Sequence, residues 1–78
     1  MEYGHAELQM HEDGVVRDAR VLIVDDLLAT GGTAHAAVRL VRKIGGAVIG
    51  CGFVVELNAL KGRERLAPVP VTSLIQYD

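Results

Sequence analysis

The sequence predicts an α/β fold, with a mainly parallel sheet and a flanking helix. Three observations indicate this class. A short apolar run at residues 21–24 is followed by an acidic pair and a glycine-rich loop. Residues 33–44 then show helical periodicity, and a second apolar run occupies residues 47–57. Strand, loop, helix and strand of these lengths form a βαβ unit, whose crossover is expected to be right-handed.

Length, charge and cysteine content exclude several classes of protein. The 78 residues are half hydrophobic, which fits one small packed domain and not a disordered segment. A net charge of −2 without a basic block argues against nucleic-acid binding. The apolar stretches are too short for a membrane span. The lone cysteine, Cys51, forbids an internal disulfide, so we expect a reduced, cytoplasmic protein.

The strands follow from apolar patterning. Residues 6–11 alternate polar and apolar, which predicts a half-exposed strand, and residues 12–14 form a turn. The unbroken apolar run at residues 21–24 predicts a central strand covered on both faces, stopped by the acidic pair. Residues 47–57 form the next strand, with Cys51 as an inert core thiol. Residues 71–76 form the last strand.

Two helices are expected. In residues 33–44 the apolar side chains fall on one stripe. This stripe consists of Ala34, Ala37, Val38, Val41 and Ile44. Arg42 and Lys43 suit the negative end of the helix dipole, and two glycines follow as a stop. A shorter helix is expected at residues 60–66, ended by Pro68.

The chemistry is expected in the loop between the first central strand and its helix. Ligands of open α/β sheets bind at the carboxyl ends of strands, and a helix N-terminus suits a phosphate. The loop consists of Ala29, Thr30, Gly31, Gly32 and Thr33. The two glycines let the backbone close around an anion, and we expect a positive φ at Gly32, where valine would abolish binding. The loop therefore predicts a monophosphate site.

Asp25 and Asp26 precede this loop and are good acceptors for paired sugar hydroxyls. Ribose 5-phosphate would satisfy both parts, and the carboxylates would favour positive charge developing on the ribose ring. The alternatives are a simple turn for the acidic pair and helix capping for the Thr-Gly-Gly-Thr sequence. A nucleotide-binding P-loop is excluded because its lysine is missing, and the glycine spacing does not fit a dinucleotide-binding fold.

Residues 21–33 resemble the phosphoribosyl-diphosphate signature of the type I phosphoribosyltransferases. Their exact sequence is similar to that of the adenine phosphoribosyltransferase branch. The resemblance continues in Glu2-Tyr3-Gly4, in residues 55–57 and 60–64, and in residues 66–70 and 73–77, which are similar to the closing segment of animal-type members. It covers essentially all 78 residues as the C-terminal part of one such domain. Residues 17–20 depart from it, because they replace the Pro-Gly that usually precedes the signature strand.

The resemblance implies a function and roles. The family transfers phosphoribose from 5-phospho-α-D-ribose 1-diphosphate to adenine, giving AMP and diphosphate, with Mg²⁺ bound to the diphosphate substrate. Asp25 and Asp26 would hold the ribose hydroxyls and residues 29–33 the 5′-phosphate. Leu57 would pack on adenine, and Glu2 would act as an acid or base near the reactive nitrogen.

The resemblance also implies limits and partners. Family members are homodimers, and their N-terminal portion, expected to be absent here, carries the adenine hood and the arginines that grip pyrophosphate. The alternative is a non-catalytic phosphoribosyl-binding or nucleotide-binding remnant. His5, His11 and His35 are too scattered for a metal site. Finally, Lys61, Arg63 and Arg65 are expected to form a solvated face.

Overall fold

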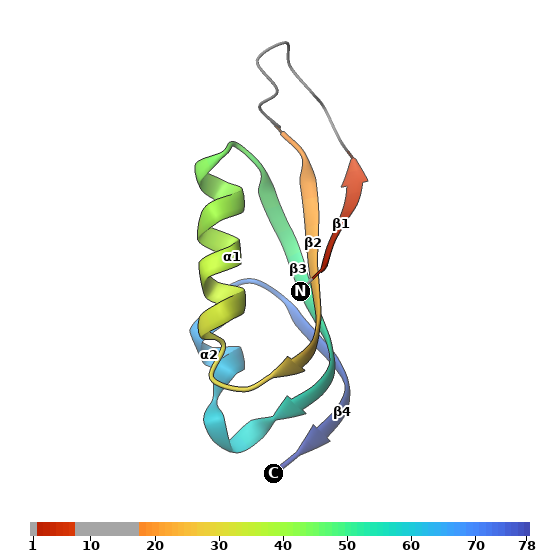
Figure 1. The fold of residues 1–78 in the computed structure, drawn as a ribbon, viewed down its shortest axis with the longest axis vertical. Coiled ribbons are helices and arrows are strands. Elements are labelled where there is room, and N and C mark those ends of the chain that lie inside the picture. The colour runs from red at the N-terminus through yellow and green to blue at the C-terminus, as the bar shows by residue number, and fades with distance from the viewer. Residues whose placement is uncertain (1, 8–17) are drawn as a thin grey trace.

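The computed structural model describes residues 2–7 and 18–78 and arranges them as a sheet with helices on one side (Figure 1). The described strands pair in the order β1-β2-β3-β4. They are β1 (Glu2–Glu7), β2 (Arg20–Leu28), β3 (Ala47–Leu57) and β4 (Val71–Tyr77). The helices are α1 (Gly32–Lys43), the 3-10 turn η1 (Asn58–Leu60) and α2 (Gly62–Leu66). Strands β2, β3 and β4 run parallel, and β1 is antiparallel to β2, so the predicted mainly parallel α/β fold is confirmed.

Strand β2 is central, as predicted, because it pairs with both β1 and β3. The expectation that it stops at the acidic pair is wrong. Its pairing continues to Leu28, which lies opposite Glu56 of β3. Leu28 is buried, and its anchoring in the core keeps the backbone extended through the two aspartates. The loop is therefore shorter than expected and tightly placed between β2 and α1.

Helix α1 matches the predicted stripe except at its end. Its buried residues are Ala34, Ala37, Val38 and Val41. Ile44, also expected on the stripe, is 47% exposed. The reason is that Ile44 caps the helix, and the chain turns away at Gly45, where φ is 97°. The positive φ at Gly45 fits the predicted glycine stop.

The core lies between α1 and one face of the sheet. Its larger members are Ile23, Leu28, Phe53 and Leu66, with Cys51 buried among them. Burial raises the pKa of the Cys51 thiol, so the side chain is a neutral core group, as predicted. Most of the packing energy of the described chain therefore resides on this single helix-covered face.

The opposite face of the sheet is apolar and open, which contradicts the expectation that residues 21–24 are covered on both faces. Because side chains alternate along a strand, Val21 and Ile23 face the core while Leu22 and Val24 face away. Leu22 is 39% exposed and Val24 37%. Within residues 2–7 and 18–78, both α-helices lie on the other side (Figure 1). An apolar run is thus compatible with one covered face only.

The remaining elements fall close to expectation. Strand β3 has the predicted limits, and β4 is one residue longer than predicted. The helix expected at residues 60–66 is divided into η1 and α2 by Lys61, whose φ is 56°. Of the strand expected at residues 6–11, residues 6 and 7 belong to β1, and the rest lies outside the described residues, as do residues 12–14. None of the helices described is long and apolar enough to cross a membrane.

Candidate functional site

A hollow of about 270 Å³ opens at the carboxyl end of β2. It is lined by residues 25–34, which come from the end of the strand, the short loop and the first turn of α1. The structure thus brings Asp25 and Asp26 together with all five residues of the predicted phosphate loop. The carboxyl end of a central parallel strand is the position where α/β sheets bind ligands.

The first turn of α1 offers backbone N–H groups to this hollow. The carbonyl of Gly31 accepts the first helical hydrogen bond, from the N–H of His35 at 2.8 Å. No side chain caps the helix, and its first turn contains no acidic residue. The N–H of Gly32 reaches the hydroxyl of Thr30 only at 3.5 Å. The start of α1 therefore keeps its positive dipole end and its donors available for an anion, and helix capping does not account for the loop.

The two glycines of the loop differ in what they require. Gly31 has φ 85°, and a Cβ built on it would lie 2.8 Å from the carbonyl oxygen of Gly62. A Cβ on Gly32 would meet nothing closer than the Thr30 hydroxyl at 3.7 Å. The expectation of a positive φ at Gly32 is wrong, because the left-handed turn falls at Gly31, one residue earlier.

The acidic pair lies within the strand, so the alternative of a simple turn is excluded. The Oδ1 of Asp25 accepts a hydrogen bond from the backbone N–H of Asp26 at 2.9 Å. This bond is the main reason that the pKa of Asp25 is lowered, so its carboxyl group is ionised at neutral pH. Asp26 is exposed. The pair therefore adds carboxylate acceptors to the same hollow that the first turn of α1 lines.

Two predicted site residues approach the hollow without lining it. Leu57 is the last residue of β3, one position beyond the pairing of Leu28 with Glu56, and so lies at the same edge of the sheet. Glu2 begins β1, and its backbone pairs with Val24, next to the acidic pair. The antiparallel direction of β1 therefore brings its first residue to the middle of β2, beside the acidic pair.

An ion pair of a buried carboxylate with an exposed arginine was missed by the sequence-based reasoning. Glu56 is 3% exposed. Its carboxylate accepts hydrogen bonds from Arg63 Nε at 3.1 Å and Nη2 at 2.8 Å, and from the Ser73 hydroxyl at 2.6 Å. Arg63 Nη1 also donates to the carbonyl of Val71 at 2.8 Å. We call these four residues the Glu56 clasp. The side chain of Arg63 is 47% exposed, so it is partly solvated as expected, but its guanidinium is also bound to Glu56.

The clasp shifts the ionisation of both partners in the direction that favours the pair. The hydrogen bonds from Arg63, followed in effect by that from Ser73, lower the pKa of Glu56. The same contact raises the pKa of Arg63. An acidic residue in the otherwise apolar run of β3 was the available signal, since a buried charge requires a partner.

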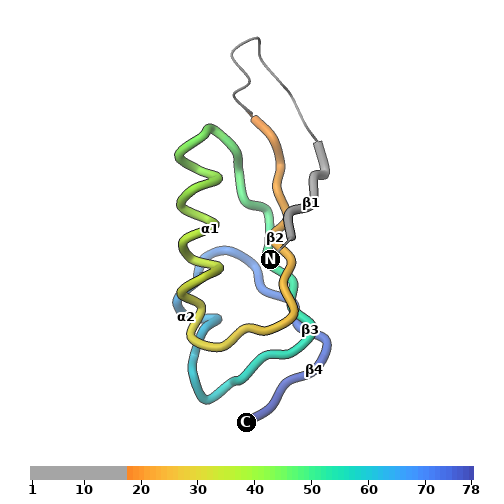
Figure 2. Tube along the Cα trace, viewed as in Figure 1, coloured from red at the N-terminus to blue at the C-terminus, as the bar shows by residue number. Residues whose placement is uncertain are grey.

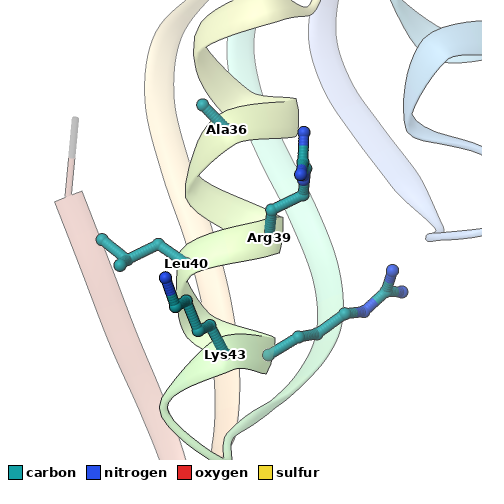
Figure 3. Close-up of a pocket in the computed structure, with 5 residues that line it drawn as sticks. Ala36, Arg39, Leu40 and Lys43 are labelled. Atoms are coloured by element: carbon teal, nitrogen blue, oxygen red, sulfur yellow. The ribbon is translucent and has the colours of Figure 1, made fainter.

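A larger hollow, of about 590 Å³, lies along the outer surface of α1 (Figure 3). It is lined by Ala36, Arg39, Leu40, Arg42 and Lys43. This surface has cations but neither carboxylates nor a helix N-terminus, so it lacks the paired chemistry of the smaller hollow. The described residues also contain no group of three or more His, Cys, Asp or Glu side chains that could hold a metal.

Two curated relatives of the chain carry the same name. The chain is 59% identical over its full length to an adenine phosphoribosyltransferase of Solibacter usitatus, of which it covers 45%. It is 54% identical to an adenine phosphoribosyltransferase of Mus musculus, of which it covers 43%. It thus spans less than half the length of these relatives.

Solved structures similar to this chain are also adenine phosphoribosyltransferases. Adenine phosphoribosyltransferase from Thermoanaerobacter pseudethanolicus aligns with 99% of this chain and half of its own, at a TM-score of 0.79 and 38% identity. The Trypanosoma brucei enzyme, solved in complex with AMP, pyrophosphate and ribose-5-phosphate, aligns with 97% of this chain at a TM-score of 0.70 and 26% identity. The phosphoribosyl transferase domain family matches residues 3–77. The chain belongs to the phosphoribosyltransferase family and carries part of its type I fold.

Proposed function

We propose that this chain carries the ribose 5-phosphate-binding part of an adenine phosphoribosyltransferase of purine salvage. The reaction would transfer phosphoribose from 5-phospho-α-D-ribose 1-diphosphate to adenine, giving AMP and diphosphate. One observation supports this most directly: the uncapped start of α1 and the carboxylates of Asp25 and Asp26 share one hollow. A phosphate at one end and sugar hydroxyls at the other match ribose 5-phosphate.

Each group has a role set by its chemistry. Backbone N–H groups of residues 29–33 would bind the phosphate, with hydroxyl donors from Thr30 and Thr33. Asp25 and Asp26 would accept hydrogen bonds from the ribose hydroxyls. Because Asp25 is ionised, its charge would also stabilise positive charge that develops on the ribose ring as the diphosphate leaves.

The base would be held at the neighbouring strand ends. Leu57, at the end of β3, would pack on the adenine ring. Glu2, at the start of β1, is proposed as the acid or base near the reactive nitrogen of adenine. Leu57 lies near the carboxyl end of β2 and Glu2 lies beside the acidic pair, on the two strands that flank β2.

Mg²⁺ fits this donor set as an ion that is held mainly by the substrate. Magnesium commonly binds one or two carboxylates together with substrate phosphates, and Asp25 and Asp26 supply two carboxylates at the hollow. When bound with the diphosphate, it would neutralise the charge of the leaving group. We also propose a homodimer in the cytoplasm; the free, buried Cys51 fits a reducing compartment.

Titrating the 78-residue chain with ribose 5-phosphate, followed by amide chemical shifts, tests the proposal. We expect shifts in residues 29–33 and a Kd of about 1 mM, because the phosphate donors are local to one loop and one helix start. Inorganic phosphate should shift the same loop, whereas ribose without phosphate should not. Asp26→Asn should weaken ribose 5-phosphate but spare inorganic phosphate. A loop that does not respond would contradict the proposal.

A second assay separates the enzyme from the non-catalytic alternative. The chain is incubated with adenine, 5-phospho-α-D-ribose 1-diphosphate and Mg²⁺, and AMP is measured. Formation of AMP supports the enzyme. Binding of ribose 5-phosphate without AMP formation favours a nucleotide-binding role for these residues and leaves catalysis to a longer chain.

A further inference from the structure

Helix α2 begins close to the phosphate loop (Figure 2). A Cβ built on Gly62 would lie 2.5 Å from the carbonyl oxygen of Ala29 and 2.7 Å from Cδ1 of Leu28. A Cβ on Gly31 would in turn lie 2.8 Å from the carbonyl oxygen of Gly62. Side chains at Gly31 and Gly62 would prevent the two segments from approaching this closely. The close approach fixes the position of α2 relative to the loop.

The Glu56 clasp fixes the rotation of α2 about its own axis. Arg63, the second residue of the helix, is tied to Glu56 on β3 and to the backbone of Val71 on β4. Residues two apart on a helix point in nearly opposite directions, at about 200°. Since Arg63 points toward the sheet, Arg65 is directed away from it and toward the start of α1.

Arg65 places its guanidinium beside the phosphate loop. A Cβ built on Gly32 would lie 3.9 Å from both Cζ and Nη1 of Arg65. Within the described residues, the side chain of Arg65 has no hydrogen bond or ion pair, in contrast to that of Arg63. The guanidinium of Arg65 therefore lies next to the free backbone N–H groups at the start of α1, without a carboxylate bound to it.

We propose that Arg65 is a further phosphate-binding residue, which donates hydrogen bonds from its guanidinium to a phosphate oxygen held at the start of α1. This assignment rests on the proposed function, because it requires a phosphate in that hollow. The planar guanidinium suits a phosphate, and its charge partly offsets the two carboxylates that lie in the same hollow. The expected solvated role of Arg65 then describes only the unliganded chain.

The test compares ribose 5-phosphate affinity in wild type, Arg65→Gln, Arg65→Lys and Arg42→Gln at moderate salt. Arg42 is the matched control: it is exposed, and it lies in the last turn of α1, about 15 Å along the helix from Gly32. We expect Arg65→Gln to raise Kd about 5-fold, Arg65→Lys to raise it less, and Arg42→Gln to change it by less than about 2-fold. Inorganic phosphate should show the same ratio for Arg65→Gln.

The outcomes separate this inference from the proposed function. If wild type binds and Arg65→Gln binds equally well, the role of Arg65 is wrong and the phosphate loop stands. If the loss appears with ribose 5-phosphate but not with inorganic phosphate, the guanidinium does not contact the phosphate, which also overturns the assignment. If wild-type residues 29–33 do not respond to either ligand, both proposals fail. Unchanged amide spectra away from the loop would show that each variant is folded.

Discussion

At the scale of single residues, the phosphate loop depends on one glycine more than on the other. The sequence analysis placed the positive φ at Gly32, because adjacent glycines give no sign of which one turns. The structure places the left-handed conformation and the contact with Gly62 at Gly31. Gly32 is the first residue of α1 and has room for a methyl group. The distinction arises from a tertiary contact and so could not be read from local sequence.

Gly31→Ala should therefore destabilise the chain, and Gly32→Ala should not. Alanine in the left-handed region costs about 1–2 kcal/mol, and the methyl group would also push against the carbonyl of Gly62. Gly32→Ala is the matched control, with an expected change below about 0.5 kcal/mol. Urea unfolding measures both free energies. Equal destabilisation by the two variants would contradict the assignment of the turn to Gly31.

At the scale of elements, the sequence correctly predicted the helices and strands that have a regular apolar periodicity. Helix α1 begins one residue earlier than predicted, and β3 has the predicted limits, because each has a clear apolar pattern bounded by glycines. The sequence-based predictions were wrong where contacts between residues distant in the sequence determine the structure. Strand β2 extends to Leu28 because that residue is anchored in the core, and the guanidinium of Arg63 binds Glu56, which is buried on another element. Neither partner can be identified from spacing along the chain.

The same division applies to the candidate site. The loop and the acidic pair were predicted because they are contiguous in sequence, and they line one hollow. Arg65 and Gly62 were not, because they reach the loop from a helix more than thirty residues later in the sequence. Their position follows from the clasp, which is a property of the folded sheet.

The clasp should make stability depend on pH below neutrality. The folded-state pKa of Glu56 is lowered from 4.5, so its contribution is fully present above about pH 4.5 and is lost as pH falls through the folded-state value. Glu56→Gln should cost about 2–3 kcal/mol at pH 7, because it leaves Arg63 without its ionic partner. The cost should shrink in acid, where wild-type Glu56 is itself neutral.

Urea unfolding at pH 7 and in acid measures this difference. Glu64→Gln, an exposed substitution on α2, is the control and should change the free energy of unfolding by less than about 0.5 kcal/mol. The same loss for Glu56→Gln at both pH values would mean that the clasp stabilises by packing alone and not by its charge.

At the scale of the whole molecule, the described residues form two layers, a sheet and the helices on one of its faces. No described helix covers the second face of the sheet. A chain of this size buries roughly 60–65% of its unfolded surface, which leaves a thin stability margin. Here that burial is confined to the α1 side. The open face presents Leu22, Val24, Val54 and Leu74, the last of these 78% exposed. Exposed apolar surface of this kind favours association.

The 78-residue chain alone should therefore self-associate through this open face at micromolar concentration. Val54→Lys places a charge at the centre of the face, on β3, and should shift the chain toward monomer because a buried, unpaired ammonium is costly. Leu40→Lys is the matched control, since Leu40 is 54% exposed but projects from α1 on the helix side of the molecule (Figure 3). Sedimentation equilibrium over a range of concentrations measures the assembly. A monomeric wild-type chain, or an equal effect of both substitutions, would show that the open face of the sheet does not drive association, and the apolar residues on it would then need another explanation.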